Sequence, residues 1–178
     1  GPAGPCTPRD DDAHIPVERV PSRLFYDGGA PDALGRGPTA AWEAARFSLA
    51  LAARLHGWGR RMDAFVSHWL VPCGALAHAW AGDRPHVAIA HSSDVHLLRR
   101  LRLTAIAGPI ARRAHLVYTS ESLRIPGAPG VVAPMGIDCA AFTATDDDRH
   151  QARTQVGART PAILFLGRFV PVKGLDLL

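Results

Sequence analysis

The chain has 178 residues, of which 47% are hydrophobic and 20% are charged, and its formal net charge is +4. This composition provides enough apolar side chains for a buried core and excludes a disordered tail. Apolar runs are interrupted by Arg, His, Gly or Pro well before the ~20 residues that a membrane span needs, and no secretory signal is recognisable. The opening Gly-Pro-Ala-Gly-Pro lacks an initiator Met, so we expect a cut edge there.

The three cysteines, Cys6, Cys73 and Cys139, form neither a disulfide framework nor a CxxC metal knuckle. A reducing compartment is the simplest interpretation, and we expect a cytoplasmic protein. Of the 20 basic residues only Lys173 is a lysine, and the others are all arginines. This bias raises the question of whether Lys173 provides a compact ammonium group that a ligand requires or stands there by chance.

The arginines gather in one stretch, residues 92–124, which contains six of them and two acids: Arg99, Arg100, Arg102, Arg112, Arg113 and Arg124, with Asp94 and Glu121. Such a stretch suits phosphates, an anionic lipid surface or a solvated helix face. Because the stretch contains only one Phe, Trp or Tyr, Tyr118, and so lacks a series of interleaved aromatic side chains to stack on bases, we expect no nucleic-acid partner.

In the N-terminal third, His14–Val20 alternates weakly, as a strand does, and Pro21–Pro38 reads as a loop. Thr39 can cap a helix that runs to about His56 and stops at Gly57. This helix has an apolar stripe at helical period, formed by Trp42, Ala45, Leu49, Ala52 and Leu55.

Short apolar strands then alternate with helices. In chain order we expect a strand at Ala64–Ser67, a helix from Pro72 to Gly82, a strand at His86–Ala90, a helical stretch Leu97–Ala114 broken at Gly108-Pro109, a strand at Leu116–Thr119, a turn or short helix at Glu121–Arg124 and a strand at Val131–Ala133. This alternation predicts an α/β fold with a Rossmann-like, doubly wound parallel sheet that is covered on both faces.

Farther along the chain, Asp146–Val156 begins with three acids and precedes Gly157, which predicts a helix. Ala162–Leu166 is strongly apolar and is expected to form a strand of a second unit, followed by a helix that opens near Lys173. The residues between the two units, 143–160, read as a connector.

Ligands of open parallel sheets bind beyond the carboxyl ends of the strands. Five successive predicted strands, from Ala64–Ser67 to Ala162–Leu166, end in polar or turn residues. We therefore expect one functional edge that carries His68 and Trp69, His91 to Asp94, Ser120 to Ser122, Pro134 to Asp138, and Gly167 with Arg168.

The segment from Gly167 to Gly174 combines a glycine turn, the guanidinium of Arg168 and the ammonium of Lys173 at a helix start. Helix N-termini attract anions, and Arg and Lys there suit a diphosphate, with a solvated turn as the alternative. The segment matches neither the Walker loop nor the GxGxxG fingerprint, so the sequence gives no support for dinucleotide oxidoreduction.

Four stretches in the expected order resemble glycosyltransferases of family-4 type, the glycosyl transferase group 1 superfamily, which have the GT-B architecture. Ile163–Leu178 resembles the start of their donor domain, and Val131–Asp138 resembles the stretch before their interdomain linker. Ser67–Gly74 and His91–His96 resemble their acceptor-domain loops. The resemblance covers most of residues 14–178.

This resemblance implies a transferase that moves a sugar, with retention of configuration, from a nucleoside-diphosphate sugar to a carbohydrate, lipid-linked or small-molecule acceptor. No metal and no cofactor beyond the donor substrate is implied. Arg168 and Lys173, with Gly167 and Gly174, would hold the diphosphate, and His91 would be the catalytic residue beside the transferred sugar. The acceptor cleft would comprise His68, Trp69, Ser92, Ser93, Asp94, Ser120, Glu121 and Gly136.

The sequence departs from the family pattern in several places. Met135 stands where Asn is usual, Val172 stands where Glu is common, and the expected glycine-rich loop after a first strand is missing. The paired-Glu motif of the family is expected beyond Leu178. We therefore expect an acceptor domain without its first strand and helix (1–142), a connector (143–160) and the first strand and helix start of a donor domain (161–178), which together would be inactive alone.

Alternative interpretations stay open. The chain could derive from a nucleotide-sugar epimerase of the same architecture, or be a non-catalytic remnant of an acceptor domain. A metal site at His91, Asp94 and His96 and a thiol nucleophile at Cys73 are weakly supported, since the thiol lacks an orienting third group. The Arg-rich segment 99–113 is either a solvated face or a peripheral membrane contact.

Overall fold

The computed structural model describes residues 20, 22, 37–159, 161–167 and 174–177. The strand expected at His14–Val20 therefore lies almost wholly outside the described residues. The chain divides into two compact units, Gly1–Pro134 and Met135–Leu178. This division falls eight residues before the end of the expected acceptor domain at residue 142, and the roles of the two units stay predictions.

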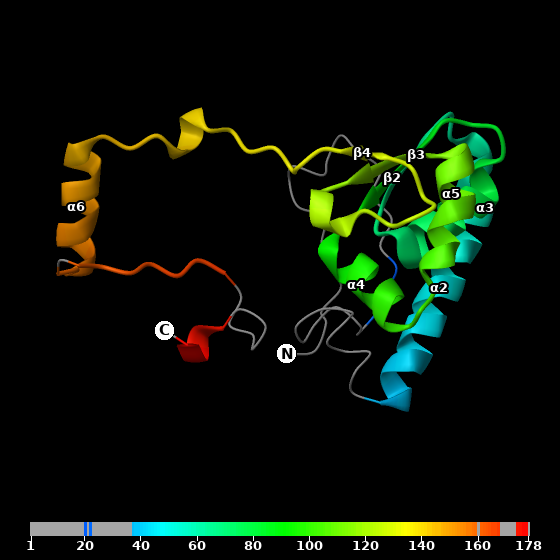
Figure 1. Cartoon of the computed structure of the whole chain (residues 1–178), viewed down its shortest axis with the longest axis horizontal. Helices are drawn as coiled ribbons and strands as arrows, with labels where there is room; N and C mark the ends of the chain where they lie inside the picture. The colour runs from blue at the N-terminus through cyan, green and yellow to red at the C-terminus, as the bar shows by residue number, and fades with distance from the viewer. Residues whose placement is uncertain (1–19, 21, 23–36, 160, 168–173, 178) are drawn as a thin grey trace. The chain divides into compact units, whose positions relative to one another are not determined.

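The first unit is built on a parallel sheet of four short strands, in the order β1-β2-β3-β4 (Figure 1). The strands are β1 (Phe65–His68), β2 (His86–Ala90), β3 (His115–Tyr118) and β4 (Val131–Val132). Each strand pairs with the next one along the chain, and the connections contain helices, as parallel pairing requires. The predicted α/β class with a parallel, Rossmann-like sheet is confirmed.

One face of this sheet forms the main core. The register aligns side chains that are all buried: Phe65 and Ser67 of β1, His86, Ala88 and Ala90 of β2, and Leu116 and Tyr118 of β3. Helix α3 (Ala75–Ala81) contacts β1 and β2, and helix α5 (Ala107–Arg113) contacts β3. On the other face Val66 is exposed and Val87 and Ile89 are half-buried. Cover on both faces, as a doubly wound sheet has, thus remains a prediction.

The first described helix, α2 (Pro38–Trp58), is longer than expected at both ends. Gly37 rather than Thr39 occupies the N-cap, with Pro38 in the first turn where its missing N–H costs nothing. Gly57 does not stop the helix, because Gly59 provides the C-cap. The predicted apolar stripe is largely wrong, since Trp42 and Leu49 are exposed. Leu55, at the end of the stripe, packs on a buried cluster formed by Phe65, Ala77 and Ala81.

The helical stretch between β2 and β3 is broken at a different place from the one expected. Helix α4 (Ser92–Arg100) ends in a turn at Leu101 and Arg102, and the short η4 (Thr104–Ile106) leads into α5. Gly108 and Pro109 do not break it, because they lie in the first turn of α5, where proline is tolerated. Shorter elements complete this unit: η2 (Gly59–Arg61), η3 (Leu70–Gly74) and η5 (Glu121–Leu123).

The second unit has one long helix, α6 (Asp146–Val156), at the bounds predicted from the sequence. The short η6 (Ala140–Phe142) precedes it and η8 (Leu175–Leu177) follows it. The strand expected at Ala162–Leu166 is wrong: this segment is extended coil without a strand partner, and Ile163, Leu164 and Leu166 are more than 80% exposed. Apolar composition alone does not make a strand when no neighbour accepts its backbone hydrogen bonds.

No helix among the residues that the structure describes is long and apolar enough to cross a membrane.

Candidate functional site

The residues that follow β1, β2 and β3 meet at the carboxyl edge of the sheet, as the sequence predicted. His68 pairs with Ile89 and Ala90 pairs with Tyr118 in the strand register. The pairing continues beyond the strands: the Trp69 amide donates to the Ile89 carbonyl at 2.9 Å and the Thr119 amide to the Ala90 carbonyl at 3.2 Å. The loops after these strands therefore begin side by side.

Two histidines form a direct pair at this edge. His68 Nδ1 and His91 Nε2 are 3.0 Å apart, and the two rings stack with a centroid distance of 5.2 Å and an interplanar angle of 25°. For two neutral imidazoles, one of these nitrogens donates and the other accepts, which requires the same tautomer in both rings, Nδ1–H in each or Nε2–H in each. His68 is exposed and His91 is half-buried, which leaves the pair accessible to a ligand from solvent.

The carboxylate of Asp94 lies buried just below the pair, in the first turn of α4, with 3% of the residue exposed. Its Oδ1 accepts the backbone N–H of His91 at 2.9 Å, and its Oδ2 accepts the backbone N–H of Leu70 in a short hydrogen bond. Burial raises the pKa of the Asp94 carboxyl, while hydrogen bonds from backbone amides, that of Leu70 foremost, act against this rise. Asp94 was expected in the acceptor cleft, and the structure shows it buried and bonded to two backbone amides.

Trp69 lies between His68 and the buried Leu70 with a backbone φ of 70°, in the left-handed region that a bulky residue rarely adopts. Its carbonyl accepts the Gly74 amide at 2.8 Å. A Cβ at Gly74 would lie 3.1 Å from this carbonyl oxygen, so glycine allows the close approach. The chain thus turns sharply after β1 and directs the Trp69–Gly74 loop back over the sheet edge.

Cys73 is partly buried in the same loop. Burial raises the pKa of its thiol, and the nearby Asp94 carboxylate raises it further. Both effects disfavour the thiolate, which is the nucleophilic form. The structure therefore gives no support to a thiol nucleophile at this position.

Ser92 and Ser93 occupy the first two positions of α4, directly after His91. Ser92 is exposed and Ser93 is half-buried. They lie at a helix start beside the histidine pair, and their role in an acceptor cleft stays a prediction.

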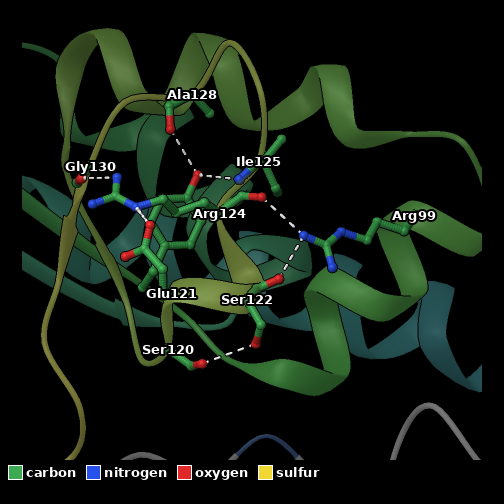
Figure 2. Close-up of polar contacts among 9 residues, drawn as sticks. Arg99, Ser120, Glu121, Ser122, Arg124, Ile125, Ala128 and Gly130 are labelled. Carbon is green, nitrogen blue, oxygen red and sulfur yellow. Dashed lines mark hydrogen bonds and ion pairs between the residues drawn. The ribbon is translucent and has the colours of Figure 1, made fainter.

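Ser120 and Glu121 belong to a second polar cluster, which follows β3 (Figure 2). Ser120 Oγ lies 3.0 Å from Ser122 Oγ, and the Glu121 carboxylate forms an ion pair with Arg124. The guanidinium of Arg99, from α4, donates to the backbone carbonyls of Ser122 and Arg124, each at 2.9 Å. Because its carboxylate is paired with Arg124, Glu121 helps to hold this turn together.

Tyr118 anchors the same turn from inside the core. Its hydroxyl donates to the Ala128 carbonyl at 2.8 Å and accepts the Ile125 amide at 3.3 Å, as Figure 2 shows. Arg124 in turn donates to the Gly130 carbonyl at 2.9 Å. The sequence analysis missed Tyr118 and Arg99 as organising residues, because a tyrosine in an apolar strand and an arginine on a helix carry no distinctive spacing.

The remaining predicted site residues belong to the second unit. Gly136 and Gly167 are exposed, and Gly174 has a left-handed backbone with φ 65°. Arg168 and Lys173 lie outside the described residues, so their diphosphate role stays a prediction. Among the residues that the structure describes, no three His, Cys, Asp or Glu side chains gather as metal ligands.

Comparison of the chain with known protein families, curated proteins and solved structures finds no match.

Proposed function

We propose that the first unit is the acceptor-side domain of a retaining glycosyltransferase of GT-B architecture. The observation that carries this proposal is the accessible His68–His91 pair at the carboxyl edge of a parallel sheet, where such folds bind their ligands. The resemblance of four stretches, in order, to family-4-type glycosyltransferases supports the same conclusion.

The chemistry of the edge suits a carbohydrate. A neutral imidazole presents one donor and one acceptor, so a sugar hydroxyl can bond to it in either sense. Ser92 and Ser93 add hydroxyl groups beside the pair. Glycosyl transfer of this kind needs mainly correct positioning and stabilisation of charge on the departing diphosphate. His91 would serve the first need, and Arg168 with Lys173 the second.

The test uses the product of the complete open reading frame that contains these residues, assayed with nucleoside-diphosphate sugars and a panel of sugar and lipid-linked acceptors. We expect transfer with retention of configuration. Arg168→Ala should lower kcat/KM by about 10- to 150-fold, the effect of losing one charge-assisted hydrogen bond. His91→Ala should lower kcat, whereas His96→Ala, an exposed histidine on α4, should not. Absence of both donor binding and transfer would contradict the proposal, as would wild-type turnover by His91→Ala.

We also propose that the turn after α4 contacts an anionic membrane surface. Leu101 and Leu103 are 53% and 46% exposed and alternate with the exposed Arg100 and Arg102. Arg102 has a left-handed backbone, φ 57°, which shapes the turn. Apolar side chains framed by cations favour the interface of an anionic bilayer, at about 1 kcal/mol per cation near the surface.

Co-sedimentation with phosphatidylglycerol vesicles tests this contact. We expect binding that weakens with salt and that falls in Arg100→Ser/Arg102→Ser, but not in the control Arg149→Ser on α6. Equal binding to phosphatidylcholine vesicles, or no loss in the double variant, would show that the turn is a solvated face.

A further inference from the structure

The starting observation is that one buried carboxylate joins two loops which come from different strands. Asp94 accepts the Leu70 amide from the loop after β1 and the His91 amide from the loop after β2. Leu70 is fully buried and Asp94 nearly so, so neither partner can exchange this contact for water. A buried carboxylate that accepts two backbone amides holds them at a fixed separation.

The two histidines belong to the two loops that Asp94 joins. His68 lies two residues before Leu70, and His91 is itself one of the two donors to Asp94. Their 3.0 Å contact therefore depends on where both loops stand relative to each other. The β1–β2 ladder fixes the loops only as far as the bond from Trp69 to Ile89, after which Trp69 turns into left-handed backbone.

We infer that Asp94 is a positioning residue whose carboxylate sets the separation of the two loops and so holds His68 and His91 as one hydrogen-bonded unit. The paired imidazoles, not His91 alone, then present donor and acceptor atoms to the ligand. The consequence for catalysis rests on the proposed function, whereas the consequence for the pair itself does not.

The substitution Asp94→Asn keeps the size of the side chain and changes its hydrogen-bonding groups, so it tests the positioning role separately from packing. The amide keeps one oxygen acceptor and places an NH₂ group where the second acceptor was, facing an N–H of Leu70 or His91. One of the two bonds is then replaced by a donor–donor contact, so the loops should move apart. Asp148→Asn is a matched control, because Asp148 also accepts the N-cap amide of its helix, at 2.8 Å from Thr145, but touches no histidine.

The first readout is the tautomer state of His68 and His91, observed in ¹⁵N-labelled protein by long-range ¹H–¹⁵N spectra and assigned with His68→Gln and His91→Gln. In the wild-type chain we expect both rings to be fixed in the same tautomer, Nδ1–H in each or Nε2–H in each. In Asp94→Asn we expect both rings to show the averaged shifts of free imidazoles, with far-UV circular dichroism unchanged, and Asp148→Asn should match the wild type. Retention of the fixed pair in a folded Asp94→Asn chain would overturn the inference.

If Asp94→Asn does not fold, a pH titration of the wild-type chain tests the inference instead. The amide protons of Leu70 and His91 should both move with one common titration at acid pH, that of the carboxyl group they share. Independence of either amide from this titration overturns the inference, and a shared titration supports it.

The second readout is turnover by the product of the complete reading frame. Asp94→Asn should lower kcat by about 10- to 100-fold with a smaller change in KM, as expected when a positioned charge-assisted contact is lost. If the tautomer pair dissolves while turnover stays at the wild-type level, positioning by Asp94 stands and the role of the pair in glycosyl transfer is wrong. If the pair persists, Asp94 does not position it, whatever the turnover.

Discussion

At the scale of single residues, the buried face of the sheet contains one polar pair that the proposed chemistry does not use. His86 Nε2 lies 2.8 Å from Ser67 Oγ, and His86 Nδ1 is buried without a hydrogen-bond partner. Phe65 contacts the His86 ring edge-on, with centroids 6.4 Å apart. Burial lowers the pKa of His86, and His78 nearby lowers it further. The pair is thus neutral in the folded state and sensitive to acid.

This pair predicts a loss of stability in weak acid. Histidine in the unfolded chain has a pKa of about 6.5, above that of folded His86, so the unfolded state binds more protons as the pH falls through that value. We expect the free energy of unfolding to decrease from pH 7.5 to pH 5, by about 1.4 kcal/mol for each unit of pKa difference. Urea unfolding at several pH values measures it.

His86→Gln removes the titrating group and should flatten this dependence, though not abolish it. The pKa of His78 is also lowered, first by burial and then by Arg113 and Arg112, and contributes with the same sign. A His86→Gln chain with the full wild-type slope would exclude His86 as the source.

Gly130 is a second residue whose role follows from geometry. A Cβ built there would lie 2.5 Å from the Leu116 carbonyl oxygen, a backbone atom that cannot move aside. We expect Gly130→Ala to displace β4 from β3 and to destabilise the first unit by about 1–3 kcal/mol. Urea unfolding measures the change, with Gly57→Ala as the counterpart.

Gly57 lies inside α2 with open space around its Cα. Alanine there should stabilise the protein by about 0.5–1 kcal/mol, because glycine costs conformational entropy within a helix. The same chemical change should therefore act with opposite signs at the two positions. A neutral Gly130→Ala substitution would mean that β4 is held elsewhere.

At the scale of elements, α6 is a helix that local signals define. Thr145 Oγ1 accepts the Asp148 amide at 3.1 Å, Asp148 accepts the Thr145 amide, and Gly157 closes the helix in left-handed backbone. Hydrogen bonds from the Thr145 side chain and backbone lower the pKa of Asp148. None of its residues is buried, so capping has an unusually large share in its stability.

Thr145→Ala should therefore fray the first turn of α6 and leave the sheet intact. Secondary chemical shifts of residues 146–150 should move toward random-coil values, while those of β1 to β3 stay unchanged. Thr154→Ala is the control, since Thr154 bonds to the His150 carbonyl within the helix and caps nothing. If the helical shifts persist in Thr145→Ala, packing rather than capping maintains the helix.

The success of the sequence analysis differs between elements for physical reasons. The bounds of β2 and α6 were predicted correctly, because a short apolar run and a capped, acidic first helical turn are local signals. The ends of α2 were missed, because a single glycine costs a helix only about 1 kcal/mol, so Gly57 does not end it. The strand at Ala162–Leu166 was wrong, because a strand depends on a partner that its own residues do not reveal.

The candidate site shows the same limit. The sequence identified His68, His91 and Asp94 from their position after strands, and the structure brings all three together. It did not reveal that Asp94 also binds the Leu70 amide, 24 positions away, because a long-range contact to backbone has no sequence pattern. Arg168 and Lys173 were recognised from spacing, and no geometry yet bears on them.

At the scale of the whole molecule, the exposed segment 161–167 predicts aggregation. Ile163, Leu164 and Leu166 project apolar side chains from extended backbone, a combination that favours pairing between chains. We expect a chain ending at Asp146 to remain monomeric at concentrations where the 178-residue chain associates, as light scattering would show.

Ile163→Ser/Leu164→Ser/Leu166→Ser in the 178-residue chain should reproduce the benefit of the truncation, which separates the segment from the rest of the second unit. Equal association of all three proteins would show that a surface other than segment 161–167 drives the association.

The order of the sheet has a consequence for synthesis on the ribosome. Each strand pairs with the one made just before it, so the sheet can grow at one edge in the order in which the chain emerges. Contacts between successive elements close short loops, and domains commonly fold as units during translation. His68, His91 and Asp94 all precede β3 in the chain. The histidine pair can therefore assemble on the nascent chain while the second unit has yet to be translated.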